Sequence, residues 1–433
     1  MQSIAIIADD LTGAADTGVQ FCSFFDETVL VPYHQLSHFL EEHSGSFSQA
    51  RTIYTNSRAL DANAARKRIC AIAHQLSQLE PGWIYKKVDS VLRGNLGAEI
   101  ETLMDELDYE LSFIAPAFPE MGRTTVDDIH KVHGTPVGQT EISRDPVTPV
   151  TESRLSLVVA AQSRYPVGHV TLDYLKGDEA GLQAEIERQF NHGIRHMAFD
   201  TTSRDDLDRI ARIVFTSSRR ILPVGSAGLA ASLGRLLPKR PASNEYESQV
   251  SGTGNHLLVC GTTSEVTKLQ IKTLIEAYPY EEIVLEAGVL ADRNQRNAIL
   301  NAVPSVRLKL SQKNVVIRID WPPNSYAAVK HSDRLRMAQS IAHGLELFVA
   351  SVLKETEPEF IFASGGDTAA AVLSAVEAKG IRIFGEVVSG MVQGKLLGGP
   401  KNGLPVVTKA GAFGKKDALV VLHESWAKKD KRI

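Results

Sequence analysis

The sequence predicts an α/β protein of two domains, each a largely parallel sheet flanked by helices, with a cleft between them. Short apolar and β-branched runs alternate with helical patterns along almost the whole chain, which is typical of parallel strands joined by crossover helices. With 433 residues, the chain is too long for one ordinary hydrophobic core. Residues 239–255 are rich in Pro, Ser, Gly and charge and have no apolar periodicity, which predicts a linker between domains at 1–238 and 256–433.

The first domain is expected to alternate strands and helices from its start. In the stretch 61–79, for example, Ala65, Ile69 and Ala73 recur with the period of a helix. The turn-rich segment 118–151 interrupts the alternation, and segments of that length are usually functional or have structure of their own. We expect strands at 4–8, 51–55, 82–88, 111–115, 168–172, 196–199 and 220–224, and helices at 61–79, 96–107, 179–190 and 204–216.

The alternation resumes after the linker and continues to the end of the chain. Short β-branched runs again precede longer helical patterns, so a second parallel sheet is expected. We expect strands at 256–260, 282–286, 314–320, 360–363, 381–384, 404–409 and 418–422, and helices at 264–277, 333–354 and 368–378.

Composition narrows the class of protein. A net charge of −4 gives no basic surface for nucleic acid, so no nucleic-acid partner is expected. The three cysteines lie far apart and have no metal-ligand spacing, which indicates reduced thiols. No apolar run approaches the roughly 18 residues of a membrane span, and the apolar start is too short for a signal peptide. We therefore expect a cytoplasmic protein without membrane contact.

The first strand ends on two carboxylates, Asp9 and Asp10, followed by a helical pattern. Ligands of α/β sheets bind beyond the carboxyl ends of parallel strands. One aspartate is expected to cap the helix and the other to contact substrate or metal.

A second polar cluster follows the strand at 82–88. Its candidate substrate-binding residues are Lys86, Lys87, Asp89, Ser90 and Arg93. Strand alternation places the two lysines on opposite faces, so only one is expected to face the ligand. Arg58, after the strand at 51–55, could join this cluster or be an ordinary surface arginine. Cations in this position suit a carboxylate substrate.

Glycine and hydroxyl residues follow strands in the second domain, a pattern that lets a helix N-terminus bind phosphate. Asp367 could cap its helix or orient magnesium through water. Neither GxxxxGK[ST] nor a complete GxGxxG follows a strand, so the site is not a P-loop. The candidate nucleotide-binding residues are Gly261, Ser264, Ser364, Gly365, Gly366, Asp367, Thr368, Gly399 and Gly411.

Six motifs in one order resemble the four-carbon acid sugar kinase family, and they cover essentially the whole chain. They are ADDLTGAADTG, KKVDSVLRGN, GSAGLA, GTTSEVT, SGGDTAAAV and LGGPKNGLPVVTKAGAFG. The resemblance implies an enzyme that uses ATP and Mg²⁺ to phosphorylate the terminal O4 hydroxyl of a four-carbon sugar acid. It also implies that the first domain holds the acid and the second the nucleotide. KKVDSVLRG is most similar to the threonate and erythronate kinases, so D-threonate is the expected substrate, with D-erythronate or a 3-oxo-tetronate as alternatives.

The resemblance also implies roles for individual residues. The substrate motifs fall on Asp9, Asp10, Arg58, Lys87, Asp89 and Ser90, and the nucleotide motifs on Ser264, Gly365 through Thr368, and Gly411. We expect Arg58 and Lys87 to bind the carboxylate, and Asp10, ahead of Asp89, to accept the hydroxyl proton. No direct metal ligand is assigned. The sequence leaves open a homodimer, a non-catalytic sugar-acid sensor, and another sugar-acid enzyme such as an isomerase or aldolase.

Overall fold

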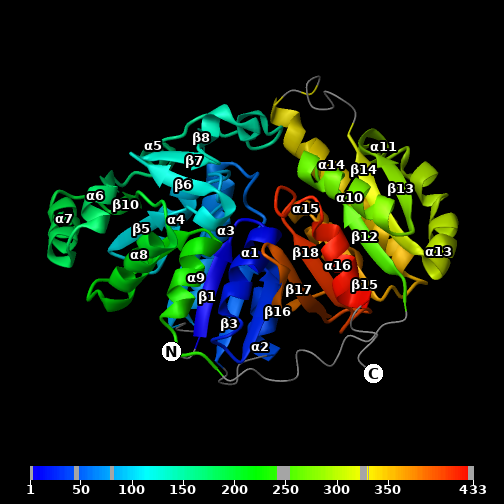
Figure 1. Cartoon of the computed structure of the whole chain (residues 1–433), viewed down its shortest axis with the longest axis horizontal. Helices are drawn as coiled ribbons and strands as arrows, with labels where there is room; N and C mark the ends of the chain where they lie inside the picture. Colours follow the sequence, from blue (N-terminus) through cyan, green and yellow to red (C-terminus); the bar gives the residue numbers. More distant parts are fainter. Residues whose placement is uncertain are drawn as a thin grey trace. The chain divides into compact units, whose positions relative to one another are not determined.

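The computed structural model describes residues 3–42, 48–78, 82–240, 254–321, 329 and 331–427. The chain divides into two compact units: one consists of Met1–Thr28 and Pro32–Arg240, the other of Val29–Val31 and Pro241–Ile433. Figure 1 shows the elements of both units in chain order. Residues 241–253, most of the predicted linker, lie outside the described residues. No described helix is long and apolar enough to cross a bilayer.

The first unit is built on a parallel sheet in the order β3-β1-β4-β11-β5-β10-β9. Ala8, the last residue of β1, pairs with Tyr54 of β3 and Lys87 of β4, so these strands end at one level. The strands are β1(Ser3–Ala8), β2(Glu27–Pro32), β3(Gln49–Tyr54), β4(Trp83–Lys87), β5(Leu111–Ala115), β9(Val167–Val170), β10(His196–Phe199) and β11(Ile221–Gly225). The middle of β2, Val29–Val31, belongs to the second unit.

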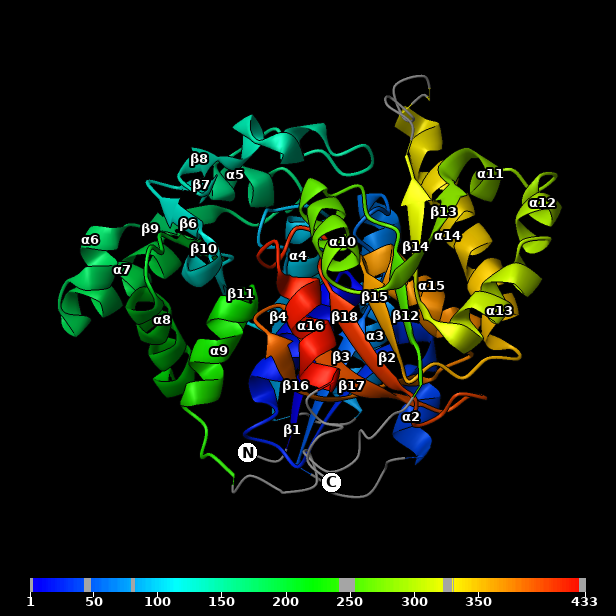
Figure 2. The same cartoon turned by 45° about the vertical axis from the view of Figure 1, so that its right-hand side comes forward.

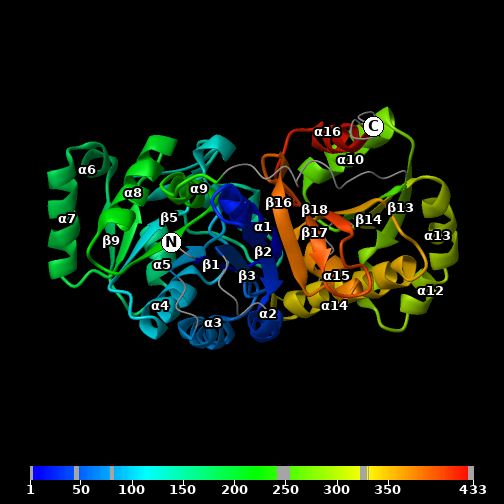
Figure 3. The ribbon, with the colours of Figure 1, turned by 90° about the horizontal axis from the view of Figure 1, so that it is seen from below.

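Helices cover both faces of this sheet. Two of them, α3 and α4, pack together on one face, and α8 and α9 pack together on the other (Figure 3). The α-helices are α1(Leu11–Gly18), α2(Leu36–Glu42), α3(Ala62–Ser77), α4(Leu96–Glu106), α5(Leu155–Ala160), α6(Leu172–Lys176), α7(Glu179–Asn191), α8(Arg204–Thr216) and α9(Ala227–Arg235), with single 3-10 turns η1(Val19–Phe21) and η2(Tyr33–Gln35). The predicted strand at 168–172 is therefore too long, because α6 begins at Leu172.

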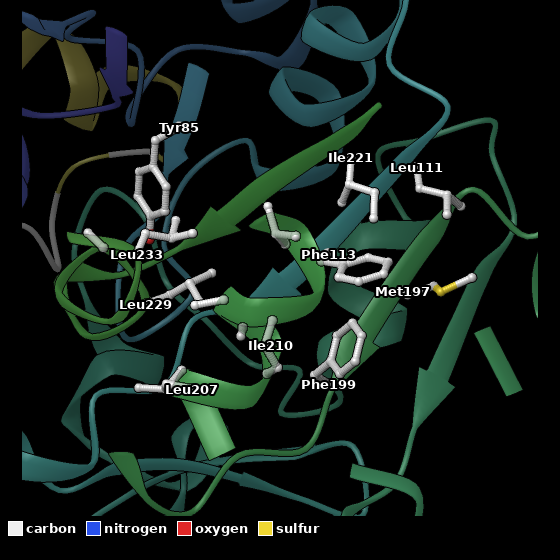
Figure 4. Packing of buried hydrophobic residues seen from close by; sticks show 14 of the residues in the cluster. Tyr85, Leu111, Phe113, Met197, Phe199, Leu207, Ile210, Ile221, Leu229 and Leu233 are labelled. Atoms are coloured by element: carbon white, nitrogen blue, oxygen red, sulfur yellow. The ribbon is translucent and has the colours of Figure 1, made fainter. Parts of the chain in front are cut away.

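The core of the first unit lies between the sheet and the pair α8–α9 (Figure 4). Phe113 of β5 and Phe199 of β10 are fully buried, and their ring centroids are 4.8 Å apart. Leu207 and Ile210 of α8 join the same cluster. Helical spacing in α8 and alternation in the strands thus direct apolar side chains to one shared interior.

The segment 118–151 has structure of its own. It forms an antiparallel sheet of β6(Arg123–Val126), β7(Ile129–Val132) and β8(Thr135–Pro136), with 3-10 turns η3(Pro119–Met121), η4(Val137–Gln139) and η5(Glu141–Arg144). Asp127 and Asp128 connect β6 to β7 with φ of 52° and 66°. Two central residues with positive φ are typical of a tight type I′ hairpin, for which Asp is well suited.

The second unit has a mixed sheet. The strands β13-β14-β12-β15-β18 are parallel, and β17 and β16 continue the sheet in antiparallel pairs. The strands are β12(His256–Cys260), β13(Tyr280–Glu286), β14(Asn314–Asp320), β15(Phe360–Ser364), β16(Gly380–Val388), β17(Met391–Leu397) and β18(Pro405–Lys409). The sequence did not predict β17, whose apolar run is interrupted by Gly394.

Helices flank this sheet as well. Figures 2 and 3 show α10 and α16 side by side on one face and α14 and α15 together on the other. The helices are α10(Glu265–Ala277), α11(Ala287–Ala291), α12(Arg296–Leu300), α13(Val303–Gln312), α14(His331–Leu353), α15(Gly366–Ala375) and α16(Ala418–Ala427).

The predicted strand at 418–422 is wrong, because these residues begin α16. A short apolar run fits a buried helix as well as a strand. The apolar residues buried on α16 are Ala418, Leu419, Leu422 and Trp426, which recur at helical spacing. Trp426 stacks on Phe360 of β15 at 4.3 Å between ring centroids, so the helix is fixed to the sheet.

We predict that Phe113→Ala lowers the free energy of unfolding by about 3–5 kcal/mol, because it removes a fully buried ring and leaves a cavity. Leu157→Ala is the control, since this side chain is 49% exposed, and it is expected to cost about 1 kcal/mol or less. Urea unfolding followed by circular dichroism measures both. Equal losses in the two variants would contradict the core assignment.

Candidate active site

The polar residues after β1, β3 and β4 meet at one edge of the first unit's sheet. Asp10 is the N-cap of α1, and its Oδ1 accepts a hydrogen bond from the Gly13 N–H at 2.8 Å. The Thr12 hydroxyl donates to Oδ2 of the same carboxylate at 2.8 Å. The expectation that one of the two aspartates caps this helix is confirmed, and Asp9 is the other one.

Arg58 joins the three aspartates of this edge. Its Nε and Nη2 donate to the two Asp9 oxygens at 2.6 and 3.0 Å, a bidentate pair. Its Nη1 donates to Oδ2 of Asp10 at 3.1 Å, and its Nη2 lies 3.7 Å from Oδ1 of Asp89. Arg58 is thus part of the acid cluster and not an isolated surface arginine.

These contacts keep buried carboxylates ionised. Burial opposes the charge of Asp9, but Arg58 and the nearby lysines outweigh it and hold the pKa of Asp9 below its ordinary value. Burial likewise opposes the charge of Asp89, yet Arg93 and Arg58 hold the pKa of Asp89 far below its ordinary value. Both carboxylates are therefore charged near neutral pH.

The two lysines of β4 point to opposite sides, as alternation predicts. Lys86 is 1% exposed; its Nζ lies 2.7 Å from Oε2 of Glu99 and donates to the Lys87 carbonyl at 2.8 Å. Glu99 also accepts from the Ser57 hydroxyl at 2.6 Å. Lys86 was one of the candidate substrate-binding residues, but its ammonium is held by Glu99 and by the Lys87 carbonyl. It ties β4 to α4 and to the residues that follow β3.

Lys87 lies on the side of Asp10. A Cβ atom added at Gly13 would come within 2.8 Å of the Lys87 Nζ and 2.5 Å of the Asp10 Oδ1, so both groups lie close to Gly13. Lys87 is 3% exposed and attracts Asp9 and Asp89 electrostatically. Within the described residues, its Nζ makes no hydrogen bond and no ion pair. This ammonium is available for an anionic ligand.

Arg93 braces Asp89. Its Nε donates to Oδ2 at 2.7 Å and its Nη2 to Oδ1 at 3.3 Å, while Nη1 reaches Asp145 at 3.4 Å. Ser90, buried beside them, completes the predicted cluster.

Three residues of this neighbourhood come from the segment 118–151 and were not predicted. They are Asp145, Arg123, which is 6% exposed and interacts electrostatically with Asp89, and His130, which hydrogen-bonds to the Ser90 carbonyl. In the sequence, the unusual length of this segment was the feature that could have indicated its place in the site.

The glycine-rich turns of the second unit also gather at strand ends. A Cβ atom at Gly261 would lie 2.4 Å from the Thr368 hydroxyl oxygen, and one at Gly411 would lie 2.3 Å from that of Thr262. Gly365 begins α15 with φ of 103°, a conformation that favours glycine. The turns after β12, β15 and β18 are therefore in contact, and glycine permits their close approach.

The remaining candidates of this unit flank the same turns. Ser264 is the N-cap of α10, and its backbone N–H donates to the Thr262 hydroxyl at 3.2 Å. Ser364 is buried at the end of β15, with its hydroxyl 3.3 Å from that of Thr267. Gly366 and Asp367 form the first turn of α15. The N-termini of α10 and α15 therefore lie beside the glycine turns, and the first N–H groups of a helix have no acceptor within the helix itself.

Gly399 does not belong to this cluster. A Cβ atom there would lie 2.5 Å from the carbonyl oxygens of Val376 and Glu377, which follow the C-terminal end of α15. Gly365 is at the N-terminal end of the same helix. Ten residues of α-helix span about 15 Å, so Gly399, in the turn after β17, lies apart from the other glycine turns, and its contact with nucleotide stays a prediction.

Lys409 was not predicted, although it lies within the last quoted motif. Its buried Nζ donates to the carbonyl oxygens of Ala410, Gly411 and Phe413 at 3.0, 3.2 and 3.2 Å, and to the Thr267 hydroxyl at 3.1 Å. Burial lowers the pKa of Lys409 to about 8. This ammonium fixes the turn that carries Gly411.

The part of the chain that the structure describes contains no group of three or more His, Cys, Asp or Glu side chains arranged to hold a metal ion.

Two family models match the chain, one after the other. Residues 4–233 match a sugar-binding N-terminal domain, and residues 257–419 match a nucleotide-binding C-terminal domain.

Characterised relatives are similar over nearly the whole chain. A D-erythronate kinase of Heliobacterium modesticaldum is 31% identical, with 96% of this chain and 95% of the relative covered. A D-threonate kinase of Salmonella typhimurium is 30% identical, with 97% and 98% covered. Among solved structures, a Salmonella typhimurium LT2 protein described as a tRNA synthase has a TM-score of 0.75 at 20% identity, covering 98% of this chain and 100% of that one. At that identity, the structural likeness shows a shared fold alone.

We predict that Glu99→Gln lowers the free energy of unfolding by about 3–5 kcal/mol, because it leaves the Lys86 ammonium buried without its counter-charge. Glu265→Gln is a matched control: its pair with Lys268 is also 2.7 Å long, but the two side chains are 77% and 48% exposed, so the cost is expected below about 1 kcal/mol. Urea unfolding at low salt compares them. Similar midpoints would show that the buried pair has no structural role.

Proposed function

Because the chain belongs to the four-carbon acid sugar kinase family, we propose that it transfers the γ-phosphate of ATP to the terminal O4 hydroxyl of D-threonate. Its relatives are named sugar-acid kinases, and the chain is one as well. The observation that carries the choice of an acid substrate is Lys87, a buried ammonium with no partner among the described residues beside three fixed aspartates. D-Erythronate is the second candidate, because a D-erythronate kinase is as similar as a D-threonate kinase.

In this proposal the first unit binds the acid. Lys87 holds the carboxylate, since a buried charge-assisted contact is stronger than a neutral hydrogen bond. Asp9 and Asp89 accept hydrogen bonds from the substrate hydroxyls. Arg58 and Arg93 hold those two carboxylates in place, so that the substrate meets oriented acceptors. Arg58 thus acts on the acid mainly through the aspartates.

Asp10 is the proposed acceptor of the O4 proton. Arginines hold the pKa values of Asp9 and Asp89 below the ordinary value, which makes these two carboxylates weak proton acceptors. Asp10 lies next to Lys87 at Gly13 and so has access to the same ligand. Phosphoryl transfer needs positioning and charge neutralisation more than a strong base.

The second unit is proposed to bind ATP. Backbone N–H groups at the starts of α10 and α15 would face the phosphates, together with Ser264 and Thr368, while Gly261, Gly365 and Gly411 let the backbone approach them. Magnesium neutralises phosphate charge when bound with ATP. Oxygen donors such as Asp367 and Thr368 suit that ion, and the phosphates would supply most of its ligands.

The test is ATP-dependent phosphorylation of D-threonate, D-erythronate, their L-forms and 3-oxo-tetronates, with product masses recorded. We expect the highest kcat/KM for D-threonate. A higher value for D-erythronate would replace the proposed substrate, and no transfer to any of these acids would overturn the proposed reaction.

We predict that Asp10→Asn mainly lowers the turnover number and that Lys87→Met mainly weakens binding of the acid. Asp10→Asn is expected to lower kcat about 10²–10⁴-fold while the KM for ATP changes less than about threefold. Lys87→Met is expected to raise the KM for the acid about 10–100-fold, because it removes a charge-assisted contact. Steady-state kinetics on variants with unchanged melting profiles checks both. An unchanged kcat in Asp10→Asn would remove Asp10 from the mechanism.

We also predict that ATP binding weakens as pH rises through about 8, the lowered pKa of Lys409. The protonated amine has three N–H donors for the acceptors that fix the Gly411 turn, whereas the neutral amine has only two and carries no charge. The KM for ATP is expected to rise about tenfold from pH 7 to 9. Lys409→Arg, which stays charged, should flatten the profile. The same rise in both proteins would exclude Lys409 as its cause.

A further inference from the structure

The segment 118–151 reaches the acid-binding residues, although the proposed mechanism does not use it. We propose that the β6–β7 hairpin positions the loop that carries Asp89 and Ser90, and that His130 is its positioning residue. The inference rests on the proposed sugar-acid kinase activity and adds a determinant of acid affinity to it.

His130 joins the hairpin to that loop directly. Its ring is fully buried, with Nε2 2.8 Å from the Ser90 carbonyl oxygen and Nδ1 3.0 Å from the Thr125 hydroxyl oxygen. A carbonyl oxygen only accepts hydrogen bonds, so Nε2 carries the proton and donates it. Nδ1 then accepts from the Thr125 hydroxyl. The two partners thus select one tautomer of a neutral ring.

The electrostatic surroundings agree with a neutral imidazole. Burial lowers the pKa of His130 to about 4, and the Ser90 carbonyl and Asp89 only partly oppose this effect. The ring therefore remains a fixed single donor through the neutral range and does not titrate there.

The orientation of the Ser90 carbonyl affects the geometry of the proposed acid site. It belongs to the Ser90–Val91 peptide group, the central one of a turn in which the Leu92 N–H donates to the Asp89 carbonyl at 3.0 Å. Leu92 has φ of 65°, which non-glycine residues rarely adopt without outside support. Fixing the Ser90 carbonyl sets the orientation of this peptide and hence the directions of the Asp89 and Ser90 side chains.

The hairpin can act as a fixed support because its own turn is anchored. The backbone N–H groups of Asp127 and Asp128 each donate to the Asp200 carboxylate at 3.0 Å, and Asp200 directly follows β10. Thr125 and Thr201 exchange two backbone hydrogen bonds of 2.9 and 2.8 Å. His130 therefore connects the Asp89 loop to the end of β10, a strand of the central sheet.

A second contact reaches the same loop from the same segment. Oδ1 of Asp145 accepts hydrogen bonds from the N–H groups of Val147 and Thr148 at 3.0 and 2.9 Å, which fixes the carboxylate. Its Oδ2 lies 3.4 Å from Nη1 of Arg93, the arginine that holds Asp89. The segment therefore reaches Asp89 by two independent routes.

The experiment compares His130→Leu with His130→Gln. Leucine has a similar volume but cannot donate to Ser90, whereas the glutamine amide can restore that bond. We expect His130→Leu to raise the KM for the acid about tenfold, with the KM for ATP changed less than twofold, and His130→Gln to recover most of the loss. His133→Asn is the matched control, because His133 is exposed in the turn directly after β7, and it is expected to leave both KM values unchanged.

Asp145→Asn tests the second route if His130→Leu fails to fold. It keeps the Oδ1 acceptor and removes the charge facing Arg93, and we expect about a threefold rise in the KM for the acid alone. The His130 ring of the wild-type protein provides a readout independent of activity, because its ¹⁵N chemical shifts identify the Nε2–H tautomer. Thr125→Val removes the hydroxyl that donates to Nδ1 and should change these shifts.

The possible outcomes distinguish a failure of the positioning role of His130 from a failure of the proposed kinase function. An unchanged KM for the acid in folded His130→Leu, an equal rise of both KM values, or an Nδ1–H tautomer in the wild-type protein would each overturn the positioning role. Absence of phosphate transfer to any sugar acid by the wild-type protein would instead overturn the proposed function, with the tautomer unaffected.

Discussion

Arg58 is the cation on which the proposed acid-binding edge of the first unit depends, because it lies among three buried carboxylates. Without it, Asp9, Asp10 and Asp89 would repel one another in a region from which water is largely excluded. Its planar guanidinium offers several donors at fixed angles, which a lysine ammonium does not. The loops after β1, β3 and β4 are therefore held by one side chain, and each carboxylate has a defined orientation before any ligand arrives.

Buried lysines perform a related task in both units. Lys86 joins Glu99 below the acid-binding edge, and Lys409 gathers the carbonyl groups of the Gly411 turn. Each ammonium replaces water as the partner of groups that the fold buries. Lys87 differs from these two lysines. The surrounding carboxylates attract it electrostatically, but its ammonium has no hydrogen-bond acceptor among the described residues. This difference supports the proposal that Lys87 binds the ligand.

The sequence predicted buried strands well because they are short apolar runs between turn signals, and residues 111–115, 196–199 and 314–320 have the bounds expected. The same signal failed at 418–422, where an apolar run forms a helix. Strand alternation predicted that the two lysines of β4 face opposite sides, but it could not say which side holds the ligand. The hairpin in 118–151 was missed because its strands are too short for a periodic signal.

The sequence by itself determined the α/β class, the family and the residues at the strand ends, because these follow from local periodicity and from motifs of adjacent residues. Tertiary structure decided which of those residues have partners. Glu99 removes Lys86 from the candidate ligand-binding groups, the end of α15 separates Gly399 from Gly365, and His130 reaches Ser90 from a distant hairpin. Such pairings join residues far apart in the chain, and the packing of the fold, not any local pattern, brings them within hydrogen-bonding distance.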